Sequence, residues 1–455
     1  MKGRIHSFAE PFISFGRGLE RHSIDPKEGL SRNKPLDYNV GRRTFSMVNL
    51  GIVALEGDLN NVIEHLANMV NAHQAAARTG GVPYPGFENI YGGLKLNIPS
   101  RKTSDSIQII SGMEIENAKK SSLPFDNIVQ LYSHKLEGLE QRREAQVAII
   151  EVPEVLQPFF SYGSERRDLR AALKALGVRK RMYTQLLLAS KLDHTQPGYD
   201  LCDNMWNLSL ALYVKAGGVP WRLEQSSEGT CFVGISFGIK FGERQSILIG
   251  LAEVFDEFGE SVNIKVVEDT YTSDRGLHLS KAKMKDLVEL AVSGYVESKN
   301  SHPQRLVLHK TTFFDDWEKQ GALLAVSDGT ACDLIYAQFR TARRLIASGG
   351  YPPDRGTFWQ TNEDGGLLYT TGYVASRKTY PGMGTPHPLQ ITKHHGDSPI
   401  TSIAKEVLGL TKMNWDSAAI MNREPVTIEY SRRVIEVLKE GVQPEQTLKD
   451  FRYYV

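Results

Sequence analysis

Three long apolar segments follow one another between residues 230 and 270, with no helical pattern between them. They cover the segments 230–241, 245–255 and 262–270. Consecutive strands joined by short connections pair with their neighbours, so this succession predicts an antiparallel meander. A helical pattern over 280–298 and a strand pattern over 305–309 come next. The second half of the chain is therefore predicted to hold a mixed sheet.

The first half of the chain alternates between strand and helix patterns. Strand patterns cover the segments 45–55, 147–152 and 184–189. Asp58 is a predicted cap for a helix that runs toward Arg78, and Ser164 is a predicted cap for a later helix. The segment 79–93 is dense in Gly and Pro and is predicted to be a loop. The alternation predicts a doubly wound parallel sheet, so the whole chain belongs to the α/β class.

Composition limits the kind of protein without identifying it. The 455 residues suffice for two or three domains, and the net charge of +1 gives no global attraction to nucleic acid. Cys202, Cys231 and Cys332 lie far apart, which argues against a disulfide framework or a zinc knuckle and favours a reducing compartment. The sequence has no signal-peptide core and no apolar run of ~20 residues. We therefore expect a cytoplasmic protein with no membrane insertion.

Several motifs occur in the order found in one known family. The segment 231–240 reads CFVGISFGIK, and 203–224 reads DNMWNLSLALYVKAGGVPWRLE, in which Gly217-Gly218 stops a helix. These two segments resemble the junction between the MID and PIWI domains of Argonaute proteins. The resemblance continues through LLYTTG (367–372), TYPGMGTPHP (379–388), LGLTKMNW (408–415) and PVTIEY (425–430). Near the start, EPFISFG (10–16) and DPKEGL (25–30) are similar to the opening of short prokaryotic Argonautes.

The resemblance implies a specific architecture. It implies a Rossmann-like MID domain with a parallel sheet, followed by an RNase H-like PIWI domain with a mixed sheet. The implied boundaries are an N-terminal extended segment over 1–40, the MID domain over 41–218 and the PIWI domain over 219–455. Full-length Argonautes are much longer, so we expect the N and PAZ domains to be missing.

A basic stretch over 166–191 is the main candidate for anion binding, because Asp168 is its only acidic residue. Arg170 and Lys174 lie four apart on a predicted helix, so they share a face and could converge on one phosphate. The family resemblance implies that a guide 5′ phosphate is held by Arg170, Lys174, Thr184, Gln185 and Lys215. The alternative is a solvated basic face, which is the usual fate of a charge run.

Further residues of this pocket follow from the resemblance. Arg170 stands where many relatives have an aromatic residue, so Tyr183 is the candidate for stacking on the first guide base. The resemblance also implies that the carboxylate of Val455 reaches the pocket and, with Mg²⁺, meets the guide phosphate, with Asn207 as a weaker ligand. The alternative is that the aromatic end of the sequence, FRYYV, closes the edge of a core.

The positions that carry metal-binding carboxylates in cleaving Argonautes are replaced. The resemblance puts Ser236, Thr311 and Arg432 at these positions. A neutral hydroxyl cannot replace a carboxylate as a hard-cation ligand, and an arginine repels a metal ion. We therefore expect a chain that is not an enzyme. A relocated metal site remains an alternative, with candidate acids Glu253, Glu268, Asp269, Asp315 and Asp316; His394 and His395 are expected to lie in a loop that contacts the nucleic-acid backbone.

The resemblance implies the recognition subunit of a prokaryotic defence system. The guide is expected to be RNA and the target single-stranded DNA, which base pairing selects. The expected partner is an APAZ-containing effector of the TIR, SIR2 or nuclease type, with NAD(P)⁺ depletion favoured over nuclease activity. The expected assembly is a heterodimer, with a higher assembly on target binding left open. Two alternatives remain, namely an active metal-dependent nuclease and a nucleic-acid-binding scaffold that uses no guide.

Overall fold

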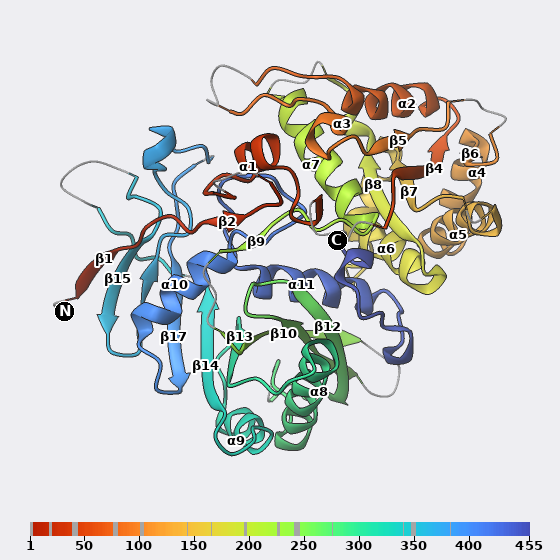
Figure 1. Cartoon of the computed structure of the whole chain (residues 1–455). Coiled ribbons are helices and arrows are strands. Elements are labelled where there is room, and N and C mark those ends of the chain that lie inside the picture. The colour runs from red at the N-terminus through yellow and green to blue at the C-terminus, as the bar shows by residue number, and fades with distance from the viewer. Residues whose placement is uncertain are drawn as a thin grey trace.

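Two large sheets, each covered by helices, make up most of the molecule (Figure 1). The computed structural model describes residues 3–17, 21–38, 44–75, 81–100, 104–142, 144–164, 166–194, 198–224, 228–240, 246–274, 276–339, 341–346, 352–382 and 384–455. A parallel sheet is followed along the chain by a mixed sheet, which confirms the predicted α/β class and the order of the two sheets.

The first large sheet, which we call the parallel sheet, has the strand order β5-β4-β7-β8, with β6 also pairing with β4. Its strands are β4 (Met47–Leu55), β5 (Lys95–Asn97), β6 (Ile107–Ile110), β7 (Val147–Val152) and β8 (Tyr183–Leu188). Every residue of β7, VAIIEV, is buried, as expected for a strand covered on both faces. Strand residues on opposite faces belong to two separate core clusters, so the sheet is doubly wound as predicted.

Helices cover both faces of the parallel sheet. One core cluster includes apolar residues of α2 (Leu59–Ala67), α3 (Phe87–Ile90) and α7 (Leu201–Lys215). The other includes apolar residues of α4 (Gly112–Lys119), α5 (Pro124–Arg142) and α6 (Leu169–Lys180). Gly217 ends the α7 turn with φ of 107°, a conformation that glycine adopts without strain, so the helix stop predicted at Gly217-Gly218 is confirmed.

The second large sheet, which we call the mixed sheet, has nine strands in the order β1-β15-β16-β17-β14-β13-β10-β11-β12. Its strands are β1 (Arg4–Ser7), β10 (Thr230–Lys240), β11 (Ile247–Phe255), β12 (Ser261–Thr270), β13 (Arg305–Lys310), β14 (Ala331–Gln338), β15 (Thr357–Asn362), β16 (Gly365–Leu368) and β17 (Leu389–His395). Strands β10, β11 and β12 pair antiparallel, which confirms the predicted meander. Strands β13 and β14 are parallel to β10, so the sheet is mixed.

Four helices pack against the mixed sheet. Apolar residues of α8 (Lys281–Lys299) and α9 (Asp316–Leu324) share a core cluster with one face of β10. Apolar residues of α10 (Ile400–Leu410) and α11 (Val426–Lys439) share a cluster with the other face. Within the described residues, no helix is both long enough and apolar enough to cross a bilayer.

Several helix predictions were wrong in detail. Helix α2 ends at Ala67, and Asp58 makes no side-chain capping hydrogen bond; Arg78, its predicted far end, lies outside the described residues. Asp168, not Ser164, caps α6, because its carboxylate accepts a hydrogen bond from the backbone N–H of Arg170. The predicted loop over 79–93 contains the short helix α3, and the helices α4 and α5 were not predicted.

The N-terminal segment is more than an extended strand. Strand β1 pairs antiparallel with β15, so the segment forms one edge of the mixed sheet (Figure 1). Strands β2 (Ile13–Ser14) and β3 (His22–Ser23) join β9 (Arg222–Leu223) in a small sheet, and helix α1 (Pro26–Asn33) follows. Nothing in the strand order tests the exact domain boundaries near residues 41 and 218, which stay predictions.

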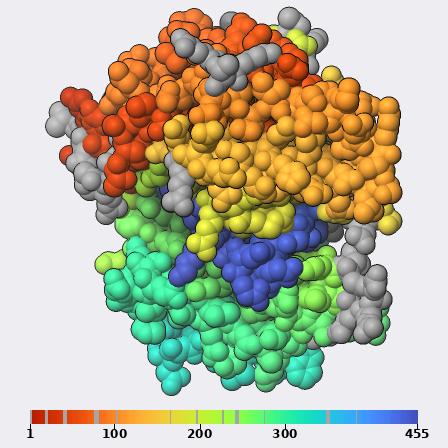
Figure 2. Space-filling model, turned by 90° about the vertical axis from the view of Figure 1, so that its right-hand side faces the viewer, coloured from red at the N-terminus to blue at the C-terminus, as the bar shows by residue number. Residues whose placement is uncertain are grey.

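The end of the sequence lies between the two large sheets. After α11, the short helices η7 (Pro444–Gln446) and η8 (Phe451–Tyr453) lead to Tyr454 and Val455, which are both buried. Helix η8 contacts α6, α7 and β8 of the parallel-sheet half. Figure 2 shows these C-terminal residues in blue, between the yellow residues of the parallel-sheet half and the green residues of the mixed-sheet half.

Candidate nucleic-acid interface

Lys174 lies at the centre of the predicted phosphate pocket and is 8% exposed. Its ammonium donates to the backbone oxygen of Thr184 at 2.6 Å and to the backbone oxygen of Val455 at 2.5 Å. Burial, followed by the charge of Lys215, lowers the pKa of Lys174 well below its usual value. The structure therefore brings helix α6, strand β8 and the end of the sequence together at one cation.

Lys215, the last residue of α7, is 1% exposed. It donates no hydrogen bond and forms no ion pair within the described residues, although its charge interacts at longer range with Asp416 and Arg433. Burial lowers its pKa to about 8, Asp416 opposes this shift, and Arg433 adds to it. A buried ammonium without a hydrogen-bond acceptor is costly, so this side chain is set up to receive an anion.

Two residues of the pocket were missed by the sequence analysis. Arg433 of α11 donates to Asp416 at 2.5 Å and to Glu429 at 2.7 Å. Burial raises the pKa of Asp416, but Arg433 and Lys215 more than offset this and lower it. The spacing of Glu429 and Arg433 is typical of a helical ion pair and could have indicated their contact, whereas nothing local marks Asp416 as a neighbour of Lys215.

Arg170 is not brought to Lys174 in the way that the sequence predicts. Its guanidinium makes a bidentate contact with Asp168, with distances of 3.0 and 2.7 Å, and lies 4.8 Å from the centre of the Phe160 ring. The side chain is half exposed, whereas Lys174 is buried. The predicted convergence of the two cations on one phosphate is therefore not formed, because Arg170 is held by the helix cap.

Tyr183 and Asn207 also have protein partners. The Tyr183 hydroxyl donates to Asp450 at 2.7 Å, and its ring stacks on Tyr453 with centroids 4.2 Å apart. One face of the ring is thus covered by protein. The Asn207 side-chain oxygen accepts a hydrogen bond from the backbone N–H of Ala418 at 3.0 Å. The predicted roles of both residues in nucleotide or metal binding stay predictions.

Strand β8, next to the pocket, carries two buried oxygen atoms without partners, on side chains that point to opposite faces of the sheet. The hydroxyl oxygen of Thr184 and the amide oxygen of Gln185 are buried and have no hydrogen-bond partner among the described residues. The nearby side-chain charges are those of Lys174, Lys215 and Arg433 against Asp416 and Glu429. A terminal phosphate carries up to about two negative charges. The net positive charge of these five side chains is smaller than that and would not neutralise it. The unpaired amide oxygen and the charge deficit therefore fit Mg²⁺, which prefers oxygen ligands.

The three positions that the family resemblance puts in place of the catalytic carboxylates lie near one another on the mixed sheet and α11. Residue Ile235 of β10 is in register with Lys310, the last residue of β13, so Ser236 lies within β10 beside the point where β13 ends and Thr311 follows. The Ser236 hydroxyl lies 2.9 Å from that of Ser431. Thr311 and Arg432 line a common cavity of 360 Å³, which we call the threonine–arginine cavity.

Carboxylates are scarce in the threonine–arginine cavity. Among the described residues that line it, Glu424 is the only acidic one, and it accepts an ion pair from Arg432 at 2.6 Å. The candidate acids Glu253, Glu268, Asp269, Asp315 and Asp316 are absent from the described lining of this cavity. The cavity therefore lacks the several free carboxylates that two-metal chemistry requires.

One cluster near β13 has the spacing of a metal site but a different role. Ligand atoms of His278, Asp315 and Glu318 lie within 4.8 Å of one another. Glu318, however, already accepts from the Lys310 ammonium, from His278 and from the backbone N–H groups of Leu279 and Asp315. Its carboxylate is fully used in fixing the start of α9, so the cluster is structural.

His394 and His395 end strand β17, so the prediction of a loop was wrong, while their contact with the nucleic-acid backbone stays a prediction. His394 accepts from the backbone N–H of Phe314 at 3.3 Å, and its ring stacks on Phe313 with centroids 5.3 Å apart. His395 is exposed at the strand end. The two side chains do not share a partner, which agrees with the alternation of side chains along a strand.

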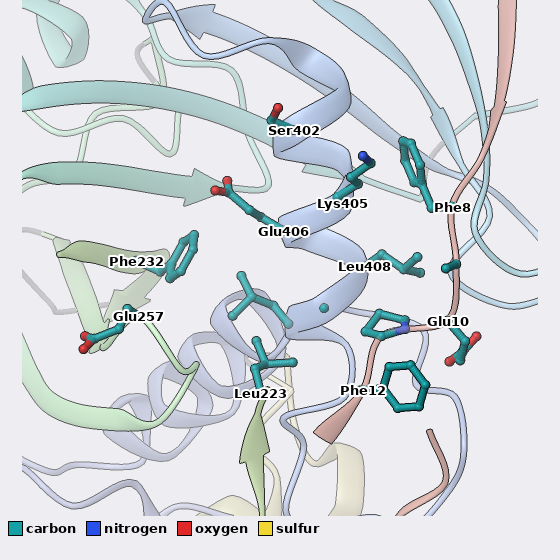
Figure 3. A pocket seen from close by; sticks show the side chains of 14 residues that line it. Phe8, Glu10, Phe12, Leu223, Phe232, Glu257, Ser402, Lys405, Glu406 and Leu408 are labelled. Atoms are coloured by element: carbon teal, nitrogen blue, oxygen red, sulfur yellow. The ribbon is translucent and has the colours of Figure 1, made fainter. Parts of the chain in front are cut away.

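A second cavity, of 470 Å³, lies between the N-terminal segment and α10 (Figure 3). Its lining includes the apolar side chains of Phe8, Phe12, Leu223, Phe232 and Leu408. Its carboxylates are paired with cations, Glu10 with Arg355 and Lys412, Glu257 with Lys299, and Glu406 with Arg305. This cavity is therefore mainly apolar, and neither Lys174 nor Lys215 of the predicted phosphate pocket is among its described lining residues.

Comparison with known proteins identifies relatives. No family model matches the sequence. The curated protein argonaute of Aquifex aeolicus (strain VF5) is 21% identical over 373 residues, which cover 80% of this chain and 46% of that protein. The chain thus spans about half the length of the curated relative that it matches.

Solved Argonaute structures share the fold. The structure of Clostridium butyricum Argonaute bound to a guide DNA and a 19-mer target DNA matches with a TM-score of 0.70 and 17% identity, over 100% of this chain and 55% of that one. The crystal structure of A. aeolicus Argonaute matches with a TM-score of 0.61 and 17% identity, over 98% and 55% of the two chains. The crystal structure of Aa-Ago with externally-bound siRNA matches with a TM-score of 0.65 and 16% identity, over 99% and 56%. The chain is therefore a homologue of the Argonaute proteins and has their fold.

Proposed function

We propose that this chain binds a short guide strand by its 5′ phosphate and uses the guide to recognise a complementary strand without cutting it. The observation that carries the proposal is the buried ammonium of Lys215, which has no hydrogen-bond acceptor within the described residues and lies near Lys174. In a site of low polarity, a phosphate would form strong charge-assisted hydrogen bonds with both lysines. A ligand phosphate thus accounts for a charge arrangement that destabilises the empty protein.

Mg²⁺ is the proposed ion of this pocket. Its proposed ligands are the amide oxygen of Gln185 and the carboxylate of Val455, taking Val455 as the end of the protein. When bound, the ion supplies positive charge between that carboxylate and the guide phosphate. Lys174 positions the end of the sequence for this role, because its ammonium donates hydrogen bonds to the backbone oxygens of both Val455 and Thr184.

The proposed guide is RNA and the proposed target is single-stranded DNA, as the family resemblance implies. Among the solved structures compared above, one holds a guide DNA with a target DNA and another has an externally bound siRNA. The proposed partner is an APAZ-containing effector with a TIR or SIR2 domain, or a nuclease, in a cytoplasmic defence heterodimer. In this proposal, the partner completes the channel that holds the guide and the target.

Sequencing the nucleic acid that copurifies with the chain tests guide binding. We expect a narrow population of short strands with 5′ phosphates, because two buried lysines select the phosphorylated end. Random fragments without 5′ phosphates, or no bound nucleic acid, would favour the scaffold that uses no guide. A parallel purification with the partner protein shows whether loading needs the completed channel.

A cleavage assay tests the absence of slicing. Protein loaded with a guide is expected to leave a complementary strand intact in Mg²⁺ or Mn²⁺, because Ser236, Thr311 and Arg432 supply no carboxylate. The assay follows an end-labelled target over hours, with a cleaving Argonaute as the positive control. A metal-dependent product of defined length, released by the chain alone, would contradict the proposal and support relocated ligands.

A further inference from the structure

The threonine–arginine cavity has an unusual balance of charge for a site derived from a metal centre. Its polar lining comprises Thr311, Thr312, Gln338, Arg423, Glu424 and Arg432. The hydroxyl oxygen of Thr312 is buried and has no hydrogen-bond partner among the described residues. The cavity thus combines two guanidinium groups and an unsatisfied hydroxyl with a single carboxylate.

Arg423 is the cation that is available for a ligand. Its guanidinium stacks on the Phe339 ring at 4.2 Å, and it has no carboxylate partner in the part of the chain that the structure describes. The stacking fixes the plane of the group and leaves its N–H edges available. Arg432 is half exposed and pairs with Glu424, and an ion pair this open to solvent stabilises a fold only weakly.

Another arginine adds to the positive charge beside this cavity. Arg344 donates to His387 and to the backbone oxygens of Thr341 and Arg343, and no carboxylate pairs with it among the described residues. The pKa of His387 is lowered by desolvation and then by Arg344 and Arg423, so both guanidinium groups lie near that ring. The surroundings of Arg423 therefore favour an anion.

We propose that the threonine–arginine cavity is a metal-free phosphodiester site, in which Arg423 and Arg432 hold a backbone phosphate of a bound strand. A guanidinium group matches two phosphate oxygens with two N–H donors, so fixed side chains would supply the charge that metal ions supply in a cleaving site. The Thr311 and Thr312 hydroxyls and the Gln338 amide can complete the contacts to phosphate oxygens. The proposal rests on the proposed function only in that the chain holds a nucleic-acid strand.

The ligand chemistry is the same for a guide and for a target, and binding measurements separate the two sources. The variant Arg423→Gln/Arg432→Gln is compared with the unchanged protein at constant Mg²⁺, first for the 5′-phosphorylated guide and then, on the loaded protein, for the complementary strand. We expect a loss of about tenfold to a hundredfold in the affinity for the strand that occupies the cavity. The slope of log affinity against log salt should fall by about one to two for the same strand.

Two control variants are needed, one at an arginine far from the cavity and one that keeps the charge of the two cavity arginines. Arg142→Gln removes an exposed arginine on α5 of the parallel-sheet half and should leave both affinities unchanged. Arg423→Lys/Arg432→Lys keeps the charge but not the planar fork, and should recover only part of the affinity. Melting temperatures close to that of the unchanged protein show that the variants are folded.

The strand whose affinity falls shows which phosphate occupies the cavity, and a loss for both strands supports a phosphate site that both share. A loss confined to the target assigns the cavity to the target phosphate, and a loss confined to the guide assigns it to the guide phosphate. Unchanged affinity for both strands, or an equal loss in Arg142→Gln, would overturn the proposal. Failure of the proposed function is seen separately, because the unchanged protein would then show no preference for a 5′-phosphorylated guide.

Discussion

Replacing Lys215 with methionine is expected to weaken the binding of a 5′-phosphorylated guide by about a hundredfold while raising the stability of the empty protein. A charge-assisted hydrogen bond from a buried ammonium to phosphate contributes about 1.5–3 kcal/mol, and about 1.4 kcal/mol corresponds to a factor of ten. The stability should rise because the variant no longer buries an ammonium without an acceptor. Few substitutions in a binding site have opposite effects on ligand affinity and on folding.

The sign of the stability effect follows from the pKa. Lys215 has a folded pKa of about 8, below its unfolded value, so charging it opposes folding at neutral pH. This penalty is fully present below about pH 8 and fades as the pH rises toward the unfolded pKa of about 10.4. The stability gain of Lys215→Met should therefore be largest at neutral pH and shrink in alkaline buffer.

Binding and melting measurements on matched variants test this prediction. Guides that differ only in a 5′ phosphate or a 5′ hydroxyl isolate the contribution of the phosphate, and Lys191→Met, an exposed lysine close to β8, is the control. Lys215→Met should abolish most of the preference for the phosphorylated guide, and Lys191→Met should keep it. An equal loss for both guides, or a lower melting temperature, would show that Lys215 acts through the fold.

Replacing Glu10 with glutamine is expected to lower the free energy of unfolding by about 3–5 kcal/mol, the typical cost of breaking a buried ion pair. Glu10 accepts from Arg355 at 2.8 Å and from the ammonium of Lys412, whose side chains are 1% and 0% exposed. A neutral amide leaves two buried cations without a counter-charge. The Glu10 carboxylate is therefore one of the charges that attach the N-terminal segment to the mixed-sheet half, together with Asp25, which pairs with Arg377.

Urea unfolding, followed by tryptophan fluorescence, measures the effect, since the indole N–H of Trp221 donates to the Lys412 carbonyl. Burial raises the pKa of the Glu10 carboxyl, but the charges of Arg355 and Lys412 lower it by more than burial raises it. The pKa of Glu10 is therefore below its usual value. The stabilisation is present above the unfolded pKa and is lost as the pH falls through the folded pKa, so the unfolding free energies of the variant and the unchanged protein should converge in acid.

The control Glu363→Gln changes an exposed carboxylate. Equal urea midpoints at pH 7 for Glu10→Gln and the unchanged protein would refute the prediction.

The positions of several strands along the sequence were predictable because they depend on local patterns. The continuous apolar runs of β7, β10 and β11 mark buried strands whatever they pair with. Helix α5 could have been predicted too, since Phe125, Ile128, Tyr132, Leu136 and Leu139 are spaced by three and four and are all buried.

The candidate site was predictable only in part. Lys174 and Lys215 were recognised from the motifs around them, and the structure places both in one buried cluster. Asp416 and Arg433 were missed because their proximity to Lys215 depends on how α11 packs against the mixed sheet and α6. The helix spacing that aligns Arg170 with Lys174 does not reveal that Arg170 contacts the carboxylate of Asp168, so its role in phosphate binding stays a prediction. Contacts between distant segments are set by packing, which no local pattern contains.

The pairing of β1 with β15 has a consequence for the order in which the protein assembles during synthesis. Arg4–Ser7 are translated long before their strand partners, Thr357 to Gln360. The parallel sheet, built from residues between Met47 and Leu188, has all of its strands long before then. Because domains fold as they are completed, the middle of the chain is expected to fold first, while its beginning waits for a partner translated far later.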